Sequence, residues 1–153
     1  MKNLLSIAML VTLSLLFISA PVEASDKTIG FVRNLSGEAF IQRNNETIPA
    51  VEGTQLKEGD VISTGPNSSL GVIFRDDSSA SLGPDSSFSV VNFEFSPKNG
   101  KNGFLMRITK GSFVYLSGLI GKISPESALF VIPSATIGIR GTQFAVTIED
   151  TDS

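Results

Sequence analysis

Few side chains in this sequence could support catalysis. The chain of 153 residues contains neither histidine nor cysteine, so the commonest general base and the thiol nucleophile are both missing. Catalysis would have to depend on paired carboxylates, such as Asp76 with Asp77, or on a serine–lysine pair, such as Ser124 with Lys122. Adjacent residues on a strand point to opposite faces, which separates the two carboxylates, and a serine near a lysine is a common coincidence. The sequence therefore predicts a protein that is not an enzyme, and it indicates no cofactor.

Acidic and aromatic residues suggest a ligand-binding alternative. Asp76, Asp77 and Asp85 lie in expected turns, and carboxylates in turns are suitable ligands for Ca²⁺. Their spacing differs from the G-G-x-G-x-D pattern of calcium-binding β-rolls, and aspartates in turns commonly bond nearby backbone instead. The phenylalanine-rich strands and Tyr115 are the candidates for a glycan or cell-wall polymer, although the chain has no tryptophan and one tyrosine. Calcium or glycan binding is therefore the alternative to protein binding, and no metal ligands are assigned.

Basic residues concentrate in one segment. No acidic residue lies between Glu94 and Glu126, whereas this segment holds Lys98, Lys101, Arg107, Lys110 and Lys122. On a projecting hairpin these five side chains would form a cationic binding surface for an anionic partner. The alternative is a solvated face whose lysines protect a strand edge. The net charge of −3 argues against nucleic acid as a partner, because nucleic-acid binders usually carry a marked basic excess.

The N-terminal residues resemble a secretory signal peptide. A short, positively charged N-terminal segment is followed by the apolar run Leu4–Ile18. The small residues Val22 and Ala24 then precede the expected cleavage site. The run is shorter than the roughly 20 residues that a membrane-spanning helix needs. We expect residues 1–24 to be removed on export to the periplasm or the cell surface, with no transmembrane segment in the mature chain. Residues 25–148 are expected to form one domain, and residues 149–153 a flexible acidic C-terminus.

The rest of the chain has the pattern of β-structure. Short runs rich in Ile, Val and Phe alternate with turn compositions, and no window shows an apolar stripe at helical spacing. Thr64–Val72 and Leu82–Val90 align at a separation of 18 residues, each as a Gly-Pro turn followed by an alternating strand. This period predicts a compact, single, all-β domain of many short strands with a solenoid- or roll-like arrangement. Two similar hairpin turns are the alternative reading of the repeat.

The longest apolar run outside the N-terminus is Phe130–Val146, and it contains one charge, Arg140. Just before Arg140 the apolar residues occupy odd-numbered positions, and after Thr142 they occupy even-numbered positions. Because side chains alternate between the two faces of a strand, an extra residue or a turn is expected between the two groups. An unpaired buried charge is costly. Arg140 is therefore expected either to extend into solvent or to pair with a carboxylate, and the hypothesis for such a pair is Asp60 or Asp76.

These residues together resemble the FecR-like domain family of bacterial envelope proteins. The resemblance covers roughly residues 35–148, and its most specific part is the closing P-x-A-x-x-G-I-R-G-T-x-F-x-V run. The motif positions expected to have structural roles are Gly59, Asp60, Asp76, Gly138, Arg140, Gly141 and Thr142.

The resemblance implies an all-β, solenoid-like domain outside the inner membrane and an association with signal relay in iron-siderophore uptake. Family members that relay this signal have a cytoplasmic segment and a membrane helix, where this chain has the expected signal peptide. We therefore expect the domain, rather than the iron-uptake pathway, to carry over. The sequence predicts an exported, non-catalytic protein-interaction module of the cell envelope with a link to signalling, through a protein partner that the sequence does not identify.

Overall fold

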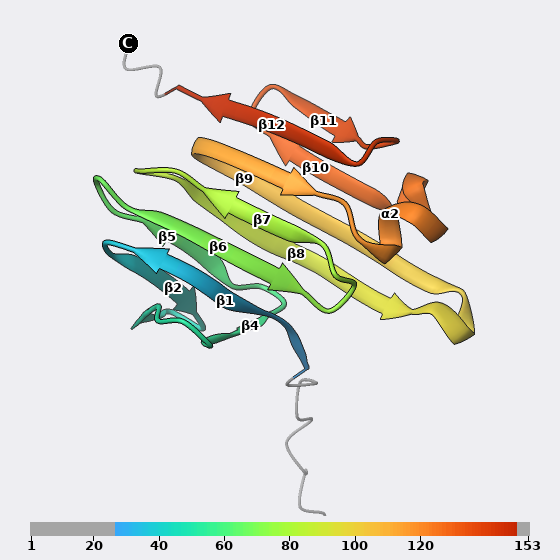
Figure 1. The fold of residues 1–153 in the computed structure, drawn as a ribbon, viewed down its shortest axis with the longest axis horizontal. Helices are drawn as coiled ribbons and strands as arrows, with labels where there is room; N and C mark the ends of the chain where they lie inside the picture. The colour runs from blue at the N-terminus through green and yellow to red at the C-terminus, as the bar shows by residue number, and fades with distance from the viewer. Residues whose placement is uncertain (1–26, 150–153) are drawn as a thin grey trace, which may run out of the picture.

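The computed structural model describes residues 27–149, and these residues confirm an all-β fold (Figure 1). They form twelve strands, the short helix α2 (Leu119–Ile123) and the 3-10 turns η2 (Pro97–Asn99) and η3 (Pro125–Ser127). The first six strands are β1 (Thr28–Ser36), β2 (Ala39–Arg43), β3 (Glu46–Pro49), β4 (Gln55–Lys57), β5 (Val61–Thr64) and β6 (Ser69–Phe74). The others are β7 (Ser79–Leu82), β8 (Ser87–Ser96), β9 (Lys101–Leu116), β10 (Ala128–Ile132), β11 (Ala135–Gly138) and β12 (Gln143–Ile148). The expected signal peptide and residues 150–153 lie outside the described residues.

The strands form one curled sheet whose main path is β3-β2-β5-β8-β9-β7-β6-β1-β4 (Figure 1). Strand β9 joins the two sides of the curl, because its first half pairs with β8 and β10 and its second half with β7 and β12. One strand of 16 residues therefore runs through residues 101–116 and belongs to both sides of the curl. Its bend coincides with Gly111, which has a φ of +78°.

The repeat of 18 residues is visible in the structure as two matching corners. The Ser68 hydroxyl accepts from the Glu38 amide (2.9 Å) and donates to the Pro66 carbonyl (3.0 Å). The Ser86 hydroxyl likewise accepts from the Ser112 amide (2.9 Å) and donates to the Pro84 carbonyl (2.9 Å). Each serine thus fixes the place where a neighbouring strand changes from one side of the curl to the other.

The solenoid- or roll-like detail of the expectation is not confirmed. In a stacked coil, β5 would lie on β7 and β6 on β8. Instead β5 pairs with β8 and β6 with β7, and both pairings are antiparallel. The sheet is better described as a curl closed around one core.

That core is aromatic and contains no disulfide. Six of its largest fully buried side chains are Phe74, Phe88, Phe104, Phe113, Tyr115 and Phe130. Tyr115 and Phe130 pack with ring centroids 4.7 Å apart, and Phe104 contacts both rings. Alternation along the strands supplies these inward residues, as the burial pattern of β6 shows.

Candidate functional site

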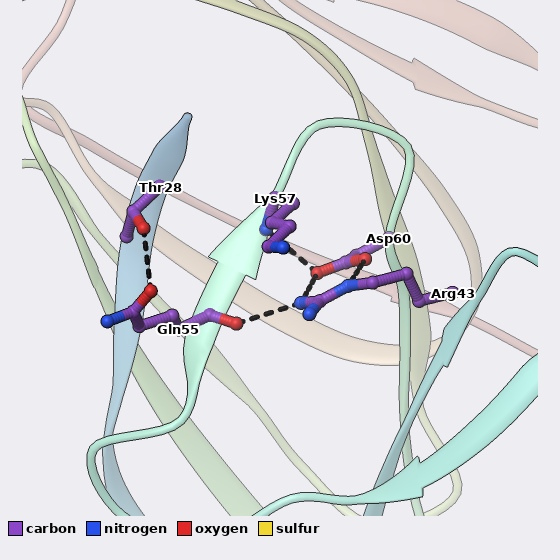
Figure 2. A network of polar contacts seen from close by, with 5 residues as sticks. All are labelled: Thr28, Arg43, Gln55, Lys57 and Asp60. Carbon is purple, nitrogen blue, oxygen red and sulfur yellow. Dashed lines mark hydrogen bonds and ion pairs between the residues drawn. The ribbon is translucent and has the colours of Figure 1, made fainter. Parts of the chain in front are cut away.

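Asp60 belongs to a structural ion pair rather than to a binding site. Its side chain is about 1% exposed, and Arg43 Nε and Nη2 donate to its two oxygens at 2.7 and 2.6 Å (Figure 2). The Lys57 amide also donates to Asp60 (2.8 Å), while Arg43 Nη2 reaches the Gln55 carbonyl (2.8 Å). Gly59 precedes Asp60 with a φ of +87°. The group therefore ties β2, β4 and the start of β5 together, and the expected Arg140–Asp60 pair is wrong.

Asp76 is also structural, and it lies in the turn between β6 and β7. It is fully buried; its carboxylate accepts from the Ser78 hydroxyl (2.5 Å) and the Ile120 amide (3.3 Å), while its carbonyl accepts from Leu119 (2.7 Å). Gly118 lies against this turn so closely that a Cβ there would be 2.8 Å from the Asp77 carbonyl carbon. Asp76 thus holds α2, a helix that the sequence did not predict, and the expected Arg140–Asp76 pair is wrong as well.

Gly138 is the last residue of β11, and Arg140, Gly141 and Thr142 lie in the connection between β11 and β12. Arg140 is exposed, which removes the need for a buried partner. The Thr142 carbonyl accepts from the Ser117 amide (2.8 Å), so the connection is attached to the end of β9. Ile139 is buried before it, and Phe144 is half-buried after it. The predicted change of strand parity at this point is confirmed.

The five basic residues do not form one surface. Lys98 and Lys101 lie at the β8–β9 turn, and Lys122 lies in α2. Arg107 is exposed in the middle of the first half of β9, and Lys110 is at the bend. From Lys101 to Lys110 a strand extends about 30 Å, so the segment distributes its charge along the molecule. Their role in binding stays a prediction.

The residues of the ligand-binding alternative are also dispersed or buried. Asp76 is engaged as above, whereas Asp77 and Asp85 are exposed turn residues with positive φ. Residues 27–149 contain no group of three or more His, Cys, Asp or Glu side chains arranged to hold a metal ion.

Tyr115 is equally unsuited to stacking on a sugar, because its side chain is fully buried. Its hydroxyl lies near Ser78 and Gly118, and burial raises the pKa of this hydroxyl well above the usual value for tyrosine.

The free edges of the sheet are the feature that sequence reasoning missed. Among the strands of residues 27–149, four pair on one side only, namely β3, β4, β11 and β12. Proteins usually protect such edges with charged residues, proline or short length. Strand β3 contains Glu46 and Pro49, and β4 has three residues and ends at Lys57. Strand β12 has six residues and no charge, and β11 has four and no charge.

The unprotected edges β11 and β12 lie near each other at the end of the curl (Figure 1), which we call the open end. Its inward apolar side chains are incompletely covered: Phe144, Val146 and Ile148 of β12 are half-buried, as are Ile132 and Ile137. Inward residues of central strands such as Phe88 and Met106 are fully buried by comparison. The open end is therefore where the core lacks a neighbouring layer.

A hollow of about 520 Å³ lies beside this edge. Its walls come from the β10–β11 turn, through Ile132, Pro133 and Ser134, and from the end of β12, through Thr147, Ile148 and Glu149. Backbone groups along an unpaired edge can bond an added strand, and an adjacent hollow can accept its side chains. The arrangement is suited to docking another polypeptide.

Comparison with protein families identifies the domain that carries this edge. Residues 60–153 match the family described as FecR protein, which is more than half of the chain. The chain belongs to the FecR protein family. The resemblance inferred from the sequence is confirmed, and membership indicates a signalling-related domain of the cell envelope.

Within this FecR-family chain, the matched residues begin at Asp60 and include β5 to β12. The Gly37-Glu38-Ala39 piece of the sequence resemblance lies before the match, as do β1 to β4. No curated protein and no solved structure matches the chain. None of the helices within residues 27–149 is long and apolar enough to cross a membrane.

Proposed function

We propose that this FecR-family chain is a non-catalytic protein-interaction module of the cell envelope, exported by its N-terminal segment and linked to signalling. Its docking site is the open end of the sheet, where a partner adds a strand to β12. Family membership supports the envelope and signalling part of the proposal. The observation that carries the docking site is the uncharged, unpaired edge Gln143–Ile148 with its half-buried apolar residues.

The alternative edges are less suited to this role. Strand β4 offers only three residues, and β3 ends at a proline that cannot donate a backbone hydrogen bond. The basic residues of the β8–β9 turn are the second candidate surface, although exposed Glu94 lies on β8 in the same hairpin. Strand addition at β12 therefore explains more of the structure than a cationic surface does.

A pull-down from envelope extract tests this proposal. The bait is the wild-type chain, compared with a variant in which the exposed residues Ala145 and Thr147 are both replaced by lysine. We expect a protein partner to be retained by wild type and at least tenfold depleted on the variant, because charged residues oppose strand addition at an edge. The control replaces Thr47 on β3 and Ser69 on β6 by lysine, both exposed positions on strands that pair with neither β9 nor β12. Equal retention by all three baits would exclude the open end as the docking site.

A further inference from the structure

We propose that the open end also takes a second copy of this chain, with the two β12 strands pairing antiparallel around a twofold axis. This inference depends on the proposed function, because it uses the same docking edge and identifies one of its partners. Closed twofold pairing uses the same surface on both subunits. It would continue the curled sheet from one subunit into the next.

The residues of β12 suit antiparallel self-pairing. Inward residues must face inward residues, since strand side chains alternate between the two faces. If Val146 lies opposite Val146 of the second copy, Phe144 lies opposite Ile148 and Ala145 opposite Thr147. Each pair then joins residues of one face, with half-buried side chains inside and exposed ones outside. Centring the axis on Ala145 instead would leave Ile148 opposite Thr142, which lies in the loop before the strand.

The charges at the two ends of β12 also favour an antiparallel copy. Exposed Arg140 precedes the strand, exposed Glu149 follows it, and Gln143–Ile148 contains no charge. Antiparallel pairing brings the positive end of each strand beside the negative end of the other. Parallel pairing would bring like charges together, which is unfavourable. In the proposed register Glu149 lies opposite the Gln143 side chain, whose amide can donate to its carboxylate.

Charge swaps on the outer face provide the test. In the proposed register, lysine at both 145 and 147 places two pairs of like charges directly opposite each other, and glutamate at both positions does the same. Sedimentation equilibrium of the purified protein should show a wild-type dimer, and each double variant should raise its Kd by about tenfold. Mixing the lysine variant with the glutamate variant should restore the dimer, because each lysine then faces a glutamate.

Restoration on mixing also shows that the variants are folded. Lysine at Thr47 and Ser69 should leave the wild-type Kd unchanged. The proposal is overturned if wild type stays monomeric, or if both double variants dimerise as wild type does, or if the mixture fails to recover.

The absence of native cysteine allows an independent check of the register. Directly opposed strand residues have Cα atoms about 4.5–5.5 Å apart, within the range that a disulfide spans. Val146→Cys alone should cross-link under mild oxidation. Ala145→Cys and Thr147→Cys should each cross-link poorly alone and well when mixed. Cross-linking of Ala145→Cys alone would contradict the proposed axis.

Failure of this inference can be told apart from failure of the proposed function. A monomeric wild-type chain that still captures an envelope protein, with loss of capture in the lysine variant, would leave the docking site intact and exclude the second copy. A dimer that forms through β12 but captures no other protein would support the second copy as the partner.

Discussion

Arg43→Ala is expected to lower the free energy of unfolding by about 3–5 kcal/mol, because it leaves the buried Asp60 carboxylate without its cation. The Asp60 side chain is about 1% exposed and that of Arg43 about 21%, so water can replace little of the lost interaction. The two Arg43–Asp60 hydrogen bonds, at 2.6 and 2.7 Å, have a bidentate geometry that lysine cannot reproduce. Urea unfolding monitored by circular dichroism measures the change.

Arg140→Ala is the matched control for this prediction. Arg140 is exposed and pairs with neither Asp60 nor Asp76, so its removal should change stability by less than about 0.5 kcal/mol. Similar losses in both variants would show that Arg140 has a structural partner. A negligible loss for Arg43→Ala would show that the buried pair contributes no net stability.

Gly111→Ala should destabilise the fold by about 2–5 kcal/mol, from left-handed backbone strain and steric overlap combined. Gly111 has a φ of +78°, and a Cβ there would lie 2.6 Å from Ser86 Cα. Ser86 cannot move away freely, because its hydroxyl forms hydrogen bonds with both Ser112 and Pro84 at this corner. Because β9 joins the two sides of the sheet at this bend, thermal and urea unfolding should both report the loss.

Gly141→Ala is the corresponding control, because no heavy atom lies within 4 Å of a Cβ at that position and its φ is not in the left-handed region. It should be nearly neutral. If Gly111→Ala is equally neutral, the bend of β9 at Gly111 would be incorrect.

Local features of the fold could be predicted because they depend on residues near one another in sequence. The β pattern and the change of strand face at Arg140-Gly141-Thr142 both follow from alternation and turn composition. The 18-residue repeat was visible because both copies use the same serine to bond the corner backbone.

Features that depend on strand partners could not be predicted in the same way. Alternation indicates which face of a strand is buried, but it does not identify the neighbouring strand. The expectation of stacked coils was not confirmed, because β5 pairs with β8 and not with β7, the strand at the equivalent place in the next repeat. The partner of Asp60 was missed for the same reason, since Arg43 is the last residue of β2 and lies beside Asp60 because β2 pairs with β5.

The open end could have been suspected from one signal. Gln143–Ile148 is a six-residue strand with no charge and no proline, a composition that requires cover on both edges. Only the sheet order shows that one edge lacks it. Sequence alone also could not show how the five basic residues are distributed, since they are close in sequence but spread along β9, its turn and α2.

The most direct test of the docking account is hydrogen exchange along β12. At low protein concentration, the amides of Gln143–Ile148 that face the free edge should exchange rapidly. Raising the concentration, or adding a partner captured in the pull-down, should protect them while leaving β3 unchanged. Protection confined to the β8–β9 turn around Lys98 and Lys101 would contradict the account and place the docking surface there instead.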